Sequence, residues 1–192
     1  MDLMPIERIP DWEQRLARQD AFWQREIIDR PVVIITTYRE NPDYPAPEPK
    51  DWPSMRERWW DTEYQTQSRL AGVMNTEFHG DALPATWPNL GPEVFSAWFG
   101  AELEYSETTS WSVPNLDDWE KADELQFSRD DPCFRKIVEM TDALLEAGRG
   151  KFYTGITDLH PGGDAVAAFR DPMRLAMDMI EYPDEVKKMI DR

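Results

Sequence analysis

Cysteine, histidine and basic side chains are all scarce in this sequence, and each shortage narrows what the protein can be. The single cysteine, Cys133, cannot form a disulfide within the chain, which fits a reducing compartment. No apolar stretch approaches the roughly 20 residues of a membrane-spanning helix. The opening segment, MDLMPIERIPDWEQ, carries acidic residues and lacks the apolar centre of a signal peptide. We therefore expect a cytoplasmic protein that does not enter a membrane.

Positive charge is outweighed along the whole chain. The 21 Lys and Arg residues face 38 Asp and Glu residues, which gives a formal net charge of −17. Binding to nucleic acid needs clustered basic side chains, so nucleic acid is not an expected partner. The same charge disfavours anionic substrates unless a local basic pocket overrides the overall field. A solvated acidic surface that keeps the protein in solution is the simpler interpretation.

The composition nevertheless predicts a folded core. Hydrophobic residues make up 41% of the chain and aromatic residues 12%, which argues against disorder. The spacing of apolar residues predicts a helix over 11–29, and the β-branched run 32–37 then predicts a strand buried on both faces, as in parallel sheets. A second helix is expected over 54–75. A period near two within 101–114 indicates a hairpin or two short edge strands.

The clearest helix is expected between Asp131 and Gly148. Asp131 is a suitable N-cap, Pro132 suits the first helical position, and Gly148 suits the C-terminal end. The apolar run 152–157 follows within a few residues and predicts another strand. A helix joined by a short loop to such a strand is typical of a βαβ unit, so the sequence indicates an α/β fold with parallel strands.

Four motifs follow one another along the chain: Phe22-Trp23…Asp29-Arg30-Pro31-Val32-Val33, Gly80-Asp81-Ala82-Leu83-Pro84…Trp87-Pro88-Asn89-Leu90-Gly91-Pro92, Gly155-Ile156-Thr157-Asp158-Leu159-His160-Pro161-Gly162-Gly163-Asp164, and Tyr182-Pro183-Asp184-Glu185-Val186. In this order they resemble the uroporphyrinogen decarboxylase superfamily, and specifically a bacterial, corrinoid methyltransferase-like branch of it. The resemblance implies the N-terminal half of a (β/α)8 TIM-like barrel, with about three parallel strands, helices and a small β insertion. The ligand is then expected at the carboxyl ends of the strands.

This resemblance also sets the expected domain organisation. Residues 1–192 would form a single partial domain, with an N-terminal helix within 1–30 and an irregular insertion over 100–129. A closed barrel of this kind needs eight strands in about 250 residues. The amphipathic tail 184–192 stops without glycine or proline, so we expect the natural protein to continue beyond Arg192.

The superfamily includes several activities, and fold alone does not choose among them. Decarboxylases of the family carry an Arg-Gln-Ala-Gly-Arg stretch after the first strand, where this chain has Tyr38-Arg39-Glu40-Asn41-Pro42. Loss of the arginine cluster makes a porphyrinogen with many carboxylates a poor substrate. The leading hypothesis is a corrinoid-linked methyltransferase-type activity on a small polar substrate. Uroporphyrinogen decarboxylation remains an alternative, as does a non-catalytic binding domain or inactive truncated barrel.

Six residues are the candidates for the site. Asp158 and His160 are two apart at the end of a strand, so they point to the same side and could bind a ligand or orient a base. Capping and loop packing are their alternative roles. Arg39 follows the first strand directly, although it could instead pair with a local acid. Trp87 and Asn89 could give a ligand an aromatic wall and an amide. Asp81 is added by the resemblance, because it falls near the decarboxylase aspartate that contacts pyrrole N–H groups.

No cofactor or metal is assigned within this chain. The zinc site of the family's methyltransferases uses His and Cys from later strands, and two His and one Cys cannot supply it. The resemblance therefore implies a corrinoid protein as partner, and zinc, only for the full-length protein. An open half barrel exposes strand edges and apolar surface, so we also expect aggregation or a homodimer.

Overall fold

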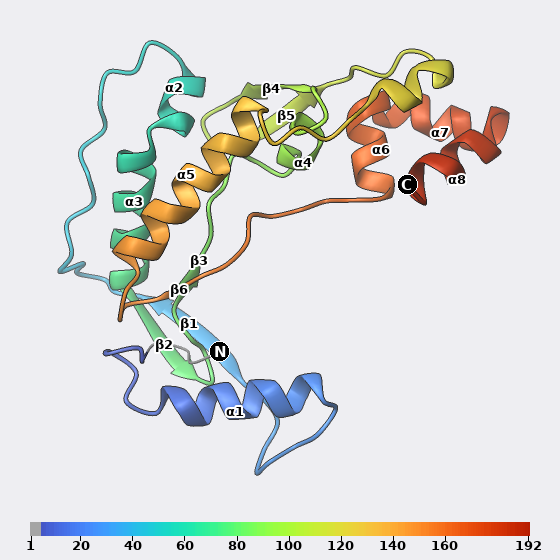
Figure 1. Ribbon diagram of the computed structural model, residues 1–192. Helices are drawn as coiled ribbons and strands as arrows, with labels where there is room; N and C mark the ends of the chain where they lie inside the picture. Colours follow the sequence, from blue (N-terminus) through green and yellow to red (C-terminus); the bar gives the residue numbers. More distant parts are fainter. Residues whose placement is uncertain (1–4) are drawn as a thin grey trace. The chain divides into compact units, whose positions relative to one another are not determined.

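The structure is a computed structural model that describes residues 5–192, and it combines helices with short strands (Figure 1). Helices account for 44% and strands for 12%. The strands form three separate two-stranded sheets, and within the described residues no barrel closes. The mixed α/β composition expected from the sequence is confirmed. None of the helices in this part of the chain is long and apolar enough to cross a membrane.

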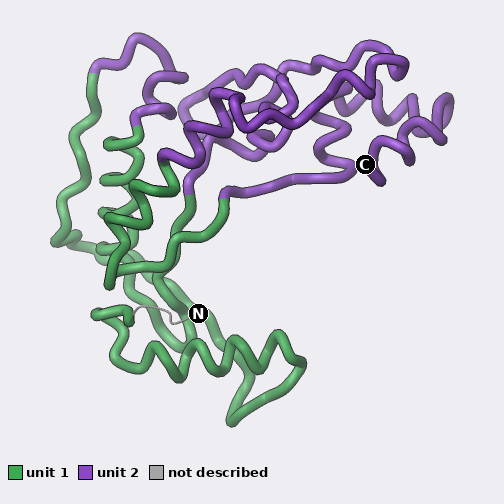
Figure 2. The backbone as a smooth tube through the Cα atoms, in the orientation of Figure 1, with its two compact units in different colours: residues 1–50, 62–87, 140–156 green, residues 51–61, 88–139, 157–192 purple. Residues whose placement is uncertain are grey.

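The chain divides into two compact units, each discontinuous in sequence (Figure 2). Unit 1 takes in residues up to 50 together with 62–87 and 140–156. Unit 2 takes in 51–61, 88–139 and 157–192. The segment 100–129, expected to be an insertion, belongs entirely to unit 2.

Unit 1 contains two of the sheets. Its elements are α1 (Trp12–Trp23), β1 (Ile34–Tyr38), α3 (Thr62–Met74), β2 (Thr76–Gly80), β3 (Ala85–Thr86), the C-terminal part of α5 (Pro132–Ala147) and β6 (Tyr153–Thr154). Its core joins Leu70 and Val73 of α3 to Leu144 of α5 and Phe152. Gly148 ends α5 where an added Cβ would lie 2.6 Å from the Phe152 ring, so this close packing requires glycine.

The N-terminal helix is shorter than the sequence predicts. Residues 1–4 of the expected helical span 1–30 lie outside the described residues, and α1 covers only Trp12–Trp23. Arg25 adopts a positive φ of 63°, and the Glu26 N–H donates to the Ala21 carbonyl. This reversal ends the helix before Ile27, which is exposed rather than buried on the predicted face.

The first strand was predicted wrongly in direction and burial. β1 pairs antiparallel with β2, with Thr36 opposite Phe78, and all five of its residues are exposed. A β-branched run specifies extended backbone but not the direction of the neighbouring strand. Here the direction is set by α3, which returns the chain so that β2 runs back along β1.

The parallel pair lies elsewhere, between β3 and β6. Ala85 is opposite Tyr153 and Thr86 is opposite Thr154, so the run expected over 152–157 forms only a short strand. The helix between them begins as predicted, because the Asp131 carboxylate accepts hydrogen bonds from the N–H groups of Cys133 and Phe134. The expected helix followed by a strand is thus confirmed, but α4, β4, β5 and η1 also lie between the two parallel strands, so the connection is not a simple βαβ unit.

Unit 2 contains the third sheet and most of the short helices. Its elements are α2 (Met55–Trp60), α4 (Val94–Ala97), β4 (Glu102–Tyr105), β5 (Ser110–Val113), the 3-10 helix η1 (Trp119–Glu124), the N-terminal part of α5, α6 (Gly163–Arg170), α7 (Pro172–Glu181) and α8 (Pro183–Ile190). The expected hairpin is confirmed by the antiparallel pairing of β4 with β5. The helix predicted over 54–75 is interrupted at Asp61, whose extended backbone separates α2 from α3.

The core of unit 2 packs α6 against η1 and the residues on either side of it. Leu116, Leu125, Ala165 and Phe169 are buried together there. In β5 the inward residues are serines rather than apolar residues, and Ser110 donates through Oγ to the Leu90 carbonyl at 2.7 Å.

Candidate functional site

Asp158 and His160 lie together in unit 2, in the irregular segment that precedes α6. Nε2 of His160 is 3.1 Å from a carboxylate oxygen of Asp158. Its Nδ1 is 3.4 Å from a carboxylate oxygen of Asp164, in the first turn of α6. The imidazole is therefore held between two carboxylates. Asp164 was not among the site residues expected from the sequence, although its spacing of four from His160 is that of neighbours on a helix.

A cavity of about 380 Å³ adjoins this histidine. Its walls include His160, Asp164, Phe95, Ser96 and Glu93. The Glu93 carboxylate is fixed, because it accepts a hydrogen bond from the Ser112 hydroxyl at 2.7 Å as well as one from the Ser112 N–H. The lining of the cavity thus includes both a fixed carboxylate and the imidazole.

The arrangement suits proton transfer to or from a small ligand. A carboxylate beside one ring nitrogen fixes the orientation of an imidazole. The His160 side chain is 38% exposed, so a ligand in the cavity can reach it. Among residues 5–192 no group of three His, Cys, Asp or Glu side chains is arranged to hold a metal ion.

Asp81 lies in unit 1 and is completely buried. Both of its carboxylate oxygens accept hydrogen bonds from Arg30, and they also accept from Arg18 at 3.2 Å and from the Val33 N–H at 3.0 Å. Burial by itself would raise the pKa of this carboxyl, but the donated hydrogen bonds outweigh it and hold the pKa below its usual value. The structure thus places Asp81 in an ion-pair network that joins α1, the Arg30 turn and β1.

Arg39 is held by acids of its own unit. Its guanidinium lies 2.8 Å from Asp43 and 3.6 Å from Glu77. The sequence left open whether Arg39 faces a ligand or pairs with a local acid. In the structure Arg39 pairs with Asp43 and Glu77. The positive charge of Arg39 is therefore partly neutralised by these two carboxylates.

Trp87 and Asn89 follow β3 but differ in their surroundings. Trp87 is 44% exposed and lines a cavity of unit 1 together with Tyr38 and Arg69. Asn89 belongs to unit 2, where its side-chain oxygen accepts a hydrogen bond from the Gly91 N–H at 2.7 Å. Gly91 has a φ of 107°, and an added Cβ would collide with the Ser110 hydroxyl, so Asn89 supports a turn that requires glycine.

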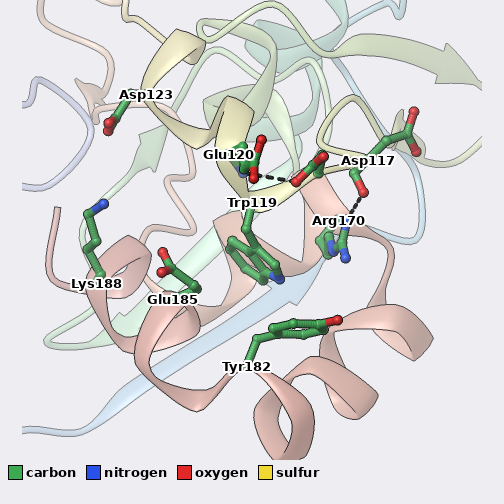
Figure 3. Close-up of a pocket in the computed structure, with 9 residues that line it drawn as sticks. Asp117, Trp119, Glu120, Asp123, Arg170, Tyr182, Glu185 and Lys188 are labelled. Atoms are coloured by element: carbon green, nitrogen blue, oxygen red, sulfur yellow. Dashed lines mark hydrogen bonds between the residues drawn. The ribbon is translucent and has the colours of Figure 1, made fainter.

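A further pocket of unit 2, of about 490 Å³, surrounds Trp119 and Tyr182 (Figure 3). Arg170 forms part of its wall and is fixed by Asp178, to which its Nε donates at 2.5 Å, and by the Leu116 carbonyl at 2.9 Å. Sequence reasoning missed this pair. The signal available was an arginine at the end of an apolar helix, eight residues before an aspartate of the next helix.

Cys133 lies in a different part of unit 2, near Tyr105. Burial, followed by the nearby charge of Asp131, raises the pKa of its thiol to about 11. The thiol is therefore protonated near neutral pH and is a poor nucleophile there.

No protein-family model, no curated protein and no solved structure matches the chain.

Proposed function

We propose that the chain is the N-terminal half of a (β/α)8 barrel enzyme of the uroporphyrinogen decarboxylase-like superfamily, in which a methyl group is transferred from a small polar substrate. The observation that carries this proposal is the Asp158–His160 pair, whose histidine lines a cavity and which follows β6, a strand of a parallel pair, after three residues of irregular chain. Residues that follow parallel barrel strands are the usual positions of catalytic groups.

The contacts of the arginines support methyl transfer over decarboxylation of a porphyrinogen. Arg39, the only arginine of the segment that follows β1, pairs with Asp43 and Glu77. Arg18 and Arg30 are bound to Asp81. A substrate with many carboxylates needs several unpaired guanidinium groups, and these three already have acidic partners.

In the proposed reaction His160 donates a proton to the atom that loses the methyl group. When a methyl group leaves oxygen or nitrogen, that heteroatom gains an electron pair and becomes a better base. Oriented through Nε2 by Asp158, the His160 ring can transfer a proton to it through Nδ1 when the exposed Asp164 side chain moves away from that nitrogen. The methyl acceptor implied by the resemblance is a corrinoid protein. The described residues do not fit a zinc site, so the proposal assigns no step to a metal in this chain.

Substitution of His160 by glutamine is expected to lower the turnover of the full-length protein by about 100-fold or more, because general acid–base groups contribute on this scale. Asp158→Asn should give a smaller loss, since it leaves the imidazole in place but misorients it. The assay supplies free cob(I)alamin as acceptor and a panel of O-methyl and N-methyl compounds as donors. Methyl transfer is followed by the change in the cobalamin absorption spectrum.

His79→Gln is the matched control, because His79 is the second of the chain's two histidines and contacts only the Thr37 hydroxyl and Glu77. It should leave turnover unchanged. A His160→Gln protein that is as active as the wild type would contradict the assignment. Formation of coproporphyrinogen from uroporphyrinogen by the same protein would establish decarboxylation instead, and folded protein inactive in both assays would favour a binding domain.

We further propose that the chain self-associates through β1. Ile34 is 63% and Ile35 51% exposed, and among the described strands only β2 pairs with β1. An unpaired apolar edge favours pairing with another strand. Sedimentation velocity should give a species larger than the monomer, and Ile35→Lys should shift it to the monomer. Ile156→Lys, which alters an exposed isoleucine outside any strand, should not. A monomeric wild-type chain would refute self-association through β1.

A further inference from the structure

Unit 1 contains a guanidinium nitrogen, Nε of Arg69, that has no hydrogen-bond partner among the described residues. Arg69 lies on α3, and its Nε is shielded from solvent without a hydrogen-bond acceptor. Burial lowers the pKa of this arginine, and among the described residues no carboxylate offsets that effect. Buried polar atoms without partners are rare in folded proteins, because each loses its hydrogen bonds to water without replacement. Such an atom indicates a missing acceptor.

The cavity beside Arg69 has a composition unlike the rest of the protein. Its volume is about 670 Å³, which is within the range of small-molecule sites. None of the residues that line it is acidic, although the chain has 38 Asp and Glu residues. Arg69 is the only cationic residue of its wall. The wall of this cavity therefore carries one positive and no negative side chain, in a protein whose net charge is −17.

The remaining walls combine aromatic rings with hydroxyl groups. Tyr38, Phe78 and Trp87 offer flat apolar surfaces, and Ser68 and Thr36 are among the lining residues that can donate hydrogen bonds. Trp87 is the residue that the sequence predicted as an aromatic wall for a ligand. All of these residues belong to unit 1, so the cavity is a feature of one compact unit.

We propose that this cavity binds a small molecule that carries one carboxylate or phosphate group on a flat apolar body, with Arg69 binding the anionic group. A planar guanidinium binds an oxyanion through two parallel hydrogen bonds, and Nε is one of the donors in that geometry. The aromatic residues contact the body of the ligand. This site does not depend on the methyl transfer proposed for unit 2.

Four probes of similar size test the charge preference by calorimetric titration: benzoate, phenyl phosphate, benzyl alcohol and benzylamine. The site should bind one or both anions and bind benzyl alcohol and benzylamine at least about tenfold more weakly, as expected for a charge-assisted hydrogen bond. Comparison of benzoate with phenyl phosphate shows which oxyanion is preferred. Absence of binding by both anions, or equal binding of benzylamine, would overturn the proposal.

Arg69→Met should weaken anion binding about tenfold or more and should raise Tm, because it removes a charged group whose shielded Nε lacks a hydrogen bond. Arg69→Lys keeps the charge without the planar fork and should bind with intermediate affinity. Arg149→Met is the matched control, since it removes an exposed arginine of the same unit and changes the net charge equally. Unchanged affinity in Arg69→Met, or an equal loss in Arg149→Met, would show that Arg69 does not bind the anion.

Discussion

Asp81→Asn is expected to lower the free energy of unfolding of unit 1 by about 3 kcal/mol, since breaking a buried ion pair leaves its partners uncompensated. The carboxylate is 0% exposed and accepts hydrogen bonds from Arg30, Arg18 and the Val33 N–H. An asparagine of the same shape offers one oxygen and no charge. Arg18 and Arg30 retain some exposure to water, which places the effect at the lower end of the usual range. Urea unfolding followed by circular dichroism measures it.

The same residue gives a pH dependence with a defined sign. The folded-state pKa of Asp81 is lowered, whereas the unfolded chain has the ordinary value. Its contribution to stability is therefore complete above about pH 4 and is lost as the pH falls through the folded-state pKa. Asp81→Asn should accordingly flatten the loss of stability on acidification.

Asp29→Asn provides the comparison for Asp81. Asp29 also binds Arg18, at 2.8 Å, but its side chain is half exposed. Exposed pairs contribute about 1 kcal/mol or less, so this variant should be only slightly less stable than the wild type. Equal losses of stability in the two variants would mean that the burial of Asp81 adds nothing to the strength of its ion pairs.

Asp178→Asn is expected to lower the free energy of unfolding of unit 2 by about 3–5 kcal/mol, because it leaves Arg170 charged and buried without its acidic partner. Arg170 is 8% and Asp178 4% exposed, which makes this pair less accessible to water than the network around Asp81. Arg170 would keep its hydrogen bonds to the carbonyls of Leu116 and Asp117 and its position over the Trp119 ring. These contacts hold the guanidinium in place, so it cannot turn outward to be solvated.

Hydrogen exchange distinguishes the two large effects. Asp178→Asn should speed exchange in α6, α7 and α8, and Asp81→Asn should speed it in β1 and β2. Asp117→Asn is the control for unit 2, because Asp117 pairs with Arg174 at the surface. Fast exchange across the whole chain in both variants would show that the two units unfold as one.

The sequence predicted those features that depend on local chemistry. Asp131 with Pro132 begins α5 as expected, and the alternation within 101–114 does form a hairpin. The neighbouring positions of Asp158 and His160 also followed from their spacing. The direction of β1 could not be predicted, because it depends on where α3 returns the chain. The end of α1 was missed because it depends on a positive φ at Arg25, a conformation that an arginine does not signal.

Contacts between residues far apart in the sequence were the second feature that could not be predicted. The sequence placed Asp81 among the catalytic candidates, but its burial depends on Arg18 and Arg30, which precede it by more than 50 residues. Arg69 was not singled out at all. Arg69 is four residues after Gln65 and three before Gly72, so the three lie on one face of the helix, beside the buried stripe of Leu70 and Val73. This face is the sequence signal that could have identified Arg69.

The discontinuous units have a consequence for how the chain is made. Unit 1 needs residues 140–156, which supply Leu144, Phe152 and the strand that pairs with Ala85. A ribosome therefore synthesises most of unit 2 before unit 1 can close. Until then Leu70 and Val73 lack part of their core, and the exposed β1 edge is available to other chains. The order of synthesis thus favours contacts between nascent chains over early folding of the N-terminal segment.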